Sequence, residues 1–303
     1  MSYTQLKPVQ CATSEASAYT PAGGSLLLRI ACFWNKYGPR GKSAIPRILG
    51  RTFGKELKIY VMTESGARLA VNPPSLDFYA HVCNHGGAWN EHVLMTCASR
   101  LKKGQVFWDI GANAGIMSID IAQRFQGDVH VLAFEPLPAL SRIIAISAAL
   151  NDFRNITAYD IMMGDQNGET NLYVGSHAIH ASAKPREQHC VEIVRRVITI
   201  DSLVRDEHIS PPSLIKMDIE GGELCALSGA RETISNHKPD IVFESDENME
   251  RFGYKRKDLL QLLSECADYE FYFIDNSGAL IPVEGSNLSA QYSDILATVQ
   301  KDR

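Results

Sequence analysis

A chain of 303 residues with 45% hydrophobic and 21% charged residues has the composition of an ordinary globular protein. Its net charge of −5 and isoelectric point near 6.0 argue against a nucleic acid as the main partner, because nucleic-acid binders usually carry a basic excess. The absence of an 18-residue apolar run predicts no transmembrane segment, and seven scattered cysteines without a CxxC pair favour a reducing, cytoplasmic location.

The first hundred residues are predicted to precede the main domain. Residues 1–22 are rich in Ser, Thr, Ala and Gln without periodicity, which predicts disorder. Residues 23–100 are expected to form an N-terminal cap with helices over 26–34 and 91–101 and strands over 57–62 and 68–71. The first helix is amphipathic, and a weaker alternative is that residues 24–35 contact a membrane surface.

Residues 101–303 are predicted to form an α/β domain. Apolar runs indicate strands at 106–110, 129–134, 156–162, 214–217, 240–243, 270–274 and 295–299. Helical periodicity indicates helices at 114–125, 138–150, 222–235 and 257–267. This alternation predicts a doubly wound, mostly parallel seven-stranded sheet covered on both faces. The last two strands have no helix between them, which predicts an antiparallel strand at one edge.

A β-rich insertion is expected at about residues 163–212, where a compact α/β unit needs far fewer residues. Strands are indicated at 170–174 and 191–200, with a polar loop between them that carries His177, His180 and His189. Long loops beside a site are often lids or clamps for a substrate. A histidine of this loop is one candidate for a catalytic base.

The turn after the first strand of this domain carries a pattern typical of cofactor binding. Ligands of open parallel sheets lie beyond the carboxyl ends of the strands, where Gly111 and Asn113 allow unusual backbone conformations. Glu135 ends the second strand and can accept hydrogen bonds from both hydroxyls of a ribose. A dinucleotide fingerprint would need a small residue where Ile116 stands, whereas D-x-G-x-x-x-G fits the turn that holds the methionine part of S-adenosylmethionine. We therefore assign cofactor contacts to Asp109, Gly111, Asn113, Gly115, Glu135 and Pro136.

A second group of acids follows the fourth and fifth predicted strands. Asp218 stands at the carboxyl edge of the sheet, where a carboxylate can take the proton of an acceptor hydroxyl, and we assign catalytic roles to Asp218, Glu220 and Glu244. The alternative is that Asp218, Glu220 and Glu223 only offset the dipole of the helix that begins there. Close acids can also hold Mg²⁺, although nothing in this spacing demands a metal.

These segments together resemble the FkbM-type methyltransferase family. The resemblance rests on residues 109–115, 134–136, 215–223 and 239–244, with residues 86–91 similar to the turn before the cofactor domain of that family. It implies a class I methyltransferase fold, S-adenosylmethionine as cofactor, and methyl transfer most often to an oxygen of a sugar or small natural product.

The sequence thus predicts an S-adenosylmethionine-dependent O-methyltransferase acting on a hydroxyl of a sugar, a glycan or a glycosylated small metabolite. One alternative keeps the cofactor and changes the acceptor to a peptide or another nitrogen or carboxylate group. Another is a catalytically silent cofactor-binding or scaffolding protein, which the presence of Gly111, Glu135 and Asp218 disfavours. The acidic charge balance predicts no nucleic-acid partner.

Overall fold

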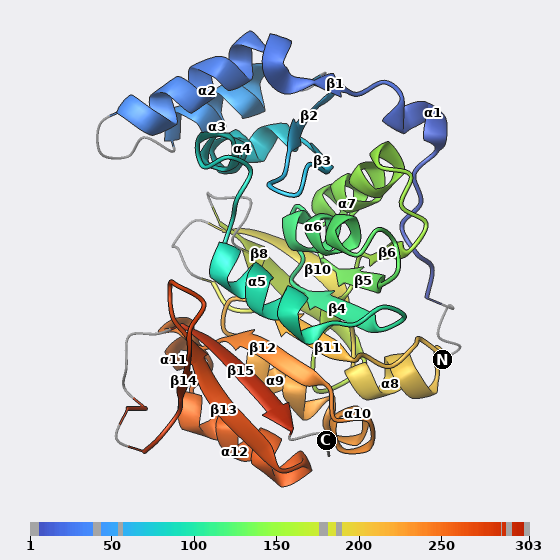
Figure 1. Cartoon of the computed structure of the whole chain (residues 1–303), viewed down its shortest axis with the longest axis vertical. Coiled ribbons are helices and arrows are strands. Elements are labelled where there is room, and N and C mark those ends of the chain that lie inside the picture. The colour runs from blue at the N-terminus through green and yellow to red at the C-terminus, as the bar shows by residue number, and fades with distance from the viewer. Residues whose placement is uncertain are drawn as a thin grey trace.

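An eight-stranded sheet forms the centre of the computed structural model, which describes residues 6–38, 44–53, 57–175, 181–185, 190–285, 287–288 and 293–299 (Figure 1). Its strands are, in spatial order, β14 (Leu280–Pro282), β13 (Tyr269–Ile274), β15 (Asp294–Val299), β12 (Asp240–Glu244), β11 (Leu214–Met217), β4 (Val106–Ile110), β5 (His130–Phe134) and β6 (Ile156–Tyr159). The five strands from β12 to β6 are parallel. This is the doubly wound class I methyltransferase arrangement that the sequence predicted.

Two strands run opposite to the parallel ones: β15, inside the sheet, and β14, at the edge where an antiparallel strand was expected. β15 pairs antiparallel with β12 on one side and with β13 on the other, and β14 adds an eighth strand at the edge beyond β13. The four central residues of β15 are buried, in the order Ile-Leu-Ala-Thr, so neither face of the strand meets solvent. A continuous apolar run of this kind is typical of an interior strand.

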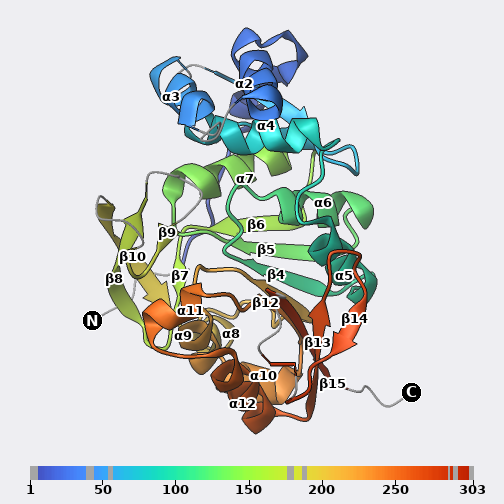
Figure 2. The same ribbon diagram turned by 90° about the vertical axis from the view of Figure 1, so that its left-hand side faces the viewer.

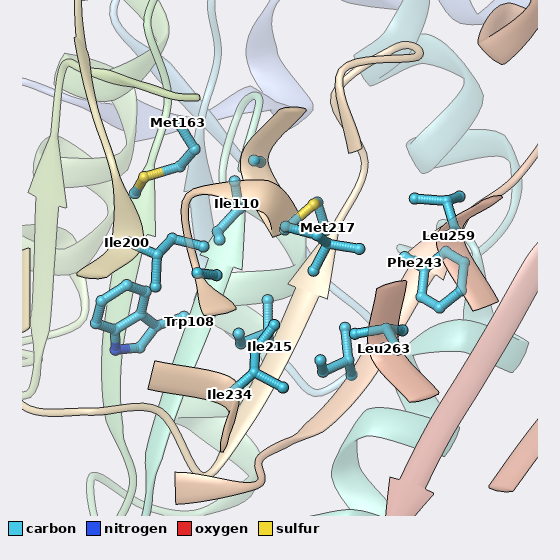
Figure 3. Packing of buried hydrophobic residues seen from close by; sticks show 14 of the residues in the cluster. Trp108, Ile110, Met163, Ile200, Ile215, Met217, Ile234, Phe243, Leu259 and Leu263 are labelled. Atoms are coloured by element: carbon cyan, nitrogen blue, oxygen red, sulfur yellow. The ribbon is translucent and has the colours of Figure 1, made fainter. Parts of the chain in front are cut away.

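Helices cover both faces of the central sheet. On one face lie α5 (Glu91–Arg100), α6 (Ile116–Arg124) and α7 (Pro138–Leu150), and on the other α8 (Ile200–Arg205), α9 (Glu223–Ser228), α10 (Arg231–His237) and α12 (Arg256–Cys266) (Figures 1 and 2). Successive residues of β4 point to opposite faces of the sheet. Phe107 packs with α5 and α6 on one face, whereas Trp108 packs with α8 and α10 on the other. Figure 3 shows the second of these layers, where Trp108 and Ile215 meet Ile200, Ile234 and Leu263.

The helix predicted over residues 222–235 is divided into α9 and α10. The break falls at Gly229, where an added Cβ would lie 2.1 Å from the backbone oxygen of Gly164. This close approach brings the helical layer against the chain at Gly164, directly after the short strand Met162–Met163. Nothing in the helical periodicity of the sequence indicated it.

The cap consists of a small sheet and three helices. β1 (Thr20–Pro21), β2 (Ile59–Met62) and β3 (Arg68–Ala70) pair side by side, and the 3₁₀ turns are Ala22–Gly24 and Pro73–Ser75. The helices are α2 (Leu26–Tyr37), α3 (Ala44–Phe53) and α4 (Leu76–Asn84), of which the sequence predicted only the first. Cap residues share one core with α6 and α7, whereas α5 packs in the main domain and not in the cap. In the described part of the chain, no helix has the length and apolarity needed to cross a membrane.

Residues 6–22 are ordered against the main domain, contrary to the predicted disorder of this segment. The short helix α1 (Thr13–Ala16) places Ala16 against Ile143 and Leu150 of α7. The backbone N–H of Val9 donates to the oxygen of Ala158 at 2.8 Å. These contacts join parts of the chain more than 100 residues apart, which local periodicity does not reveal.

The predicted β-rich insertion forms a second sheet in the order β7 (Met162–Met163), β10 (Val191–Ile198), β8 (Gly168–Val174) and β9 (Ala181–Ser182). The strand predicted over residues 156–162 ends at Tyr159, and Met162 already belongs to this second sheet. His177, His180 and His189 lie outside the described residues.

Candidate active site

A cavity of about 640 Å³ lies at the edge of the central sheet where the parallel strands end. The segments that follow β4, β5, β6, β11 and β12 line it, together with the second sheet and three cap residues, Phe78, Trp89 and Asn90. This position is expected, because parallel strands direct their carboxyl ends to one edge of a doubly wound sheet.

The turn after β4 is held against β5 and against the turn that follows β11. The N–H groups of Gly111 and Ala112 donate to the oxygen of Phe134 at 2.9 and 3.1 Å. Gly111 has φ +77°, and a Cβ there would lie 1.9 Å from the backbone oxygen of Asp218. The glycine therefore serves a contact between two turns of the protein, in addition to the ligand approach expected from the sequence.

Gly115 lies behind the cavity wall rather than in it. It has φ +82°, and a Cβ there would lie 2.7 Å from Cγ1 of Ile144 on α7. Between the two glycines, Asn113 has φ +52° and lines the cavity. Gly115 thus supports the packing of α6 on α7, whereas Gly111 and Asn113 line the cavity.

Glu135 presents a buried carboxylate to the cavity. Its side chain accepts the N–H of Asn113 at Oε2 and the N–H of Leu137 at Oε1, both at 2.9 Å. The residue is only 5% exposed, and burial raises its pKa to about 7 against the opposing effect of these two N–H donors. Each oxygen keeps a further lone pair for a ligand hydroxyl. Pro136 follows it in the cavity wall.

A buried ion-pair group connects the sheet to the cavity. Lys216, near the end of β11, places Nζ 3.5 Å from Oδ2 of Asp218 and 3.7 Å from Oδ1 of Asp109. Asp109 is fully buried, accepts the hydroxyl of Ser118 at 2.6 Å and does not line the cavity. Burial by itself lowers the pKa of Lys216, but the carboxylates of Asp218 and Asp109 outweigh it and leave the pKa raised. Lys216 is therefore charged, and the carboxylate of Asp109 stabilises this charge from the side that faces away from the cavity.

Asp218 is the carboxylate of this group that lines the cavity. Its side chain lines the cavity and is 33% exposed, whereas Lys216 is 11% exposed. Its backbone N–H donates to the oxygen of Ile110 at 3.0 Å, so the turns after β4 and β11 fix its position. The geometry places a carboxylate with an adjacent cation at the floor of the cavity.

Glu220 and Glu223 have different environments in the turn that follows. Glu220 lines the cavity with φ +59°, and its Oε2 accepts the amide N–H of Asn248 at 3.2 Å. Glu223 is 1% exposed and accepts the N–H of Ile219 and the hydroxyl of Tyr254 at 2.9 and 3.0 Å. Glu223 therefore stabilises the turn from inside the protein through hydrogen bonds, and it does not line the cavity.

Glu244 ends β12 in the wall of the same cavity. Burial raises its pKa to about 10, with further contributions from the negative charges of Asp218, Asp246 and Glu220. At neutral pH this carboxyl carries its proton, so it can donate a hydrogen bond but cannot act as a base.

The structure brings most of the predicted site residues together. Gly111, Asn113, Glu135, Pro136, Asp218, Glu220 and Glu244 line one cavity, whereas Asp109 and Gly115 stand behind its wall. Four residues of the cavity lining were not assigned to the site from the sequence: Lys216, Asn248, Phe78 and Trp89. A lysine within the apolar run of β11 could have drawn attention to Lys216, whereas no sequence feature singled out the other three. Among the described residues, no group of three or more His, Cys, Asp or Glu side chains is arranged to hold a metal ion. That finding gives the possible Mg²⁺ no support.

Comparison with known proteins identifies a protein family that this chain matches. A family model described as the methyltransferase FkbM domain matches residues 109–271, more than half of the chain. Hexuronic acid methyltransferase AglP of Haloferax volcanii is 24% identical over 177 residues, which make up 58% of this chain and 68% of that protein.

Two solved structures resemble the chain more distantly. Methyltransferase FkbM from Methylobacillus flagellatus KT aligns with a TM-score of 0.47 and 19% identity over 75% of this chain and 54% of that one. A SAM-dependent O-methyltransferase from Thermotoga maritima aligns with a TM-score of 0.39 and 13% identity over 84% and 82% of the two chains. The chain thus spans about half the length of the solved FkbM methyltransferase that it matches.

Proposed function

Because the chain belongs to the FkbM methyltransferase family, and is therefore an S-adenosylmethionine-dependent methyltransferase, we propose that its acceptor is a hydroxyl of a sugar, a glycan or a glycosylated small metabolite. The observation that carries this proposal is the Asp218 carboxylate at the floor of the cavity, beside Lys216. The similarity to a protein named as a hexuronic acid methyltransferase supports a sugar as the acceptor.

The residues at the ends of β4 and β5 fit S-adenosylmethionine. Glu135 offers free lone pairs on a carboxylate whose direction two backbone N–H groups fix, which suits the hydroxyls of a ribose. The turn at Gly111 and Asn113 would hold the methionine part. When bound, the cofactor supplies an electrophilic methyl group to the acceptor end of the cavity.

The charges of the lining support a neutral acceptor rich in hydroxyl groups. Among the described residues that line the cavity, Lys216 is the one Lys or Arg, whereas six acids lie there besides the protonated Glu244; the six are Glu135, Asp165, Glu169, Asp218, Glu220 and Asp246. Carboxylates accept hydrogen bonds from hydroxyl groups and repel phosphates. The same lining therefore disfavours a nucleic acid as the acceptor.

Asp218 would act on the acceptor as a general base. A sugar hydroxyl is a weak nucleophile until its proton is removed, and an ionised carboxylate within hydrogen-bond reach can hold and take that proton. Lys216 keeps Asp218 in place through the ion pair at 3.5 Å. Protonated Glu244 would donate a hydrogen bond to another oxygen of the acceptor and so help to orient it.

Mass spectrometry with deuterated methyl donor tests this proposal. The purified protein is incubated with a panel of neutral glycosides, uronic acids, amines and peptides, and each product is examined for a gain of one labelled methyl group. We expect an alkali-stable methyl ether on a glycoside. Label found on a peptide, an amine or an alkali-labile carboxyl ester instead would refute a hydroxyl acceptor while leaving the methyltransferase activity intact.

A further inference from the structure

The outer surface of α2 and α3 is apolar and open. We call it the α2–α3 face and define it by seven side chains that are 37% to 70% exposed: Leu26, Ile30, Phe33, Tyr37, Ile45, Ile48 and Phe53. The described residues include 12 large hydrophobic side chains that are this exposed, and these seven are the majority of them. A concentration of apolar surface of this kind on a folded protein usually marks an interaction site.

Helical geometry gathers these side chains on one side. Leu26, Ile30, Phe33 and Tyr37 follow the spacing of one helix face, while Leu28 and Ala31 on the opposite side are buried in the cap. In both ribbon views α2 and α3 form the outermost layer, beyond α4 and far from the central sheet (Figures 1 and 2). The face therefore points away from the methyltransferase cavity and is separate from it.

The charge of this region is opposite to that of the whole chain. Between Glu15 and Glu56 the sequence holds seven Lys or Arg residues and no Asp or Glu, in a protein whose net charge is −5. In the described part, Arg29, Lys36 and Arg51 are exposed on the same two helices. Asp77 of α4, the acid beneath α3, is buried and lies 3.9 Å from Arg47, so it adds little negative charge to the surface.

We propose that the α2–α3 face binds the surface of a membrane that contains anionic lipids. Aromatic and aliphatic side chains on one side of a helix enter the boundary between headgroups and acyl chains, and neighbouring cations attract anionic headgroups. Lys36, whose Nζ lies 5.3 Å from the centre of the Tyr37 ring, combines both features at one end of α2. A second copy of the chain is a poorer partner, because a symmetric contact would bring two basic faces together.

Flotation with lipid vesicles tests the proposal on the full chain. Vesicles of phosphatidylcholine and phosphatidylglycerol in a 3:1 ratio are compared with vesicles of phosphatidylcholine alone, at low and high salt. We expect binding to the anionic vesicles that weakens with salt, since screening reduces the attraction between charges. Binding to the neutral vesicles should be much weaker.

Variants with matched controls identify the surface responsible. Phe33→Ser with Tyr37→Ser should reduce binding to the anionic vesicles at least tenfold, whereas Val191→Ser with Val194→Ser, equally exposed on β10, should leave it unchanged. Arg29→Gln with Lys36→Gln should reduce it about fivefold per removed charge. Lys102→Gln with Lys257→Gln is the charge control, because both side chains are exposed and lie outside α2 and α3.

Three outcomes of these experiments would contradict the proposal. Absence of binding to anionic vesicles would refute it, and so would binding that the α2 variants leave unchanged. Sedimentation of the wild-type chain as a dimer that Phe33→Ser with Tyr37→Ser dissociates, without vesicle binding, would assign the face to a second copy. Binding of S-adenosylhomocysteine shows that each variant is folded, since none of the substituted residues lines the cavity.

Discussion

A Cβ at position 111 would lie 1.9 Å from the backbone oxygen of Asp218, so the turns after β4 and β11 meet at a point that only glycine fits. This contact links the part of the cavity that we propose for the cofactor, which begins at Gly111, to the part that we propose for the acceptor, where Asp218 lies. The two halves of the site are therefore positioned relative to one another through backbone atoms.

Gly111→Ala is expected to separate these turns. Strain from φ +77° adds about 1–3 kcal/mol, and displacement of the Asp218 backbone adds to it, so the free energy of unfolding and the affinity for S-adenosylhomocysteine should both fall. Gly104→Ala is the control, because Gly104 has φ +80° and an added Cβ there would meet nothing within 4 Å. Equal losses in both variants, measured by urea unfolding, would show that the contact with Asp218 has no effect of its own.

The local pattern of the sequence was sufficient to predict the strands and the turns that carry the site. β4, β5 and β11 are short, mainly apolar runs followed directly by glycine or an acidic residue, and β12 ends on Glu244; these features are readable within about ten residues. Parallel pairing then brings Glu135 and Asp218 to the same edge, although 82 residues separate them.

Features that depend on distant contacts were not predictable in this way. The N-terminal segment is ordered because Ala16 packs on α7, and the helix after β11 is broken because Gly229 meets Gly164. Likewise, nothing near Asp109 in the sequence indicates that its charge is compensated by Lys216. Its place beneath the cavity wall, rather than in it, follows from that pairing.

Glu135→Ala is expected to weaken binding of S-adenosylhomocysteine by about 1.5–3 kcal/mol, the usual effect of losing hydrogen bonds to a charged group. The variant also leaves the N–H groups of Asn113 and Leu137 without their acceptor, so the turn itself should be less stable. Calorimetry on wild type and variant measures the change in affinity. A larger rise in melting temperature with NAD than with S-adenosylhomocysteine would contradict the assigned cofactor.

Lys216→Met is expected to destabilise the fold by about 3–5 kcal/mol, because it leaves the buried Asp109 without a compensating charge. Burial already raises the pKa of Asp109, so at low pH the carboxyl can take a proton and the loss should be smaller there. Adding Asp109→Asn to Lys216→Met removes the stranded charge and should recover part of the stability. A double variant no more stable than Lys216→Met at pH 8 would show that the pairing is not the cause.

Glu223→Gln should change how stability depends on pH. Burial raises the pKa of Glu223 to about 7, above its ordinary value of 4.5, so the folded protein holds this proton more tightly than the unfolded chain. Stability is therefore lost as pH rises from about 4.5 through 7. Without the carboxyl, the loss between pH 5 and pH 8 should be smaller by on the order of 2 kcal/mol in urea unfolding. Glu192→Gln, on the exposed surface of β10, should not alter the pH dependence.

Asp218→Asn distinguishes between the three acids that the sequence proposed as catalytic. Asparagine keeps the shape of the side chain but cannot take a proton, so methyl transfer should slow by ~10²–10⁴-fold while the affinity for the cofactor hardly changes. Glu244→Gln should slow it only a few fold, because the pKa of Glu244 is raised to about 10 and its carboxyl is already neutral at pH 7. Glu220→Gln keeps the side-chain oxygen that accepts from Asn248, and its effect should appear mainly in the acceptor KM. Steady-state kinetics with the acceptor identified by mass spectrometry measure all three. Full turnover by Asp218→Asn, together with a large loss in Glu220→Gln, would move the base to Glu220.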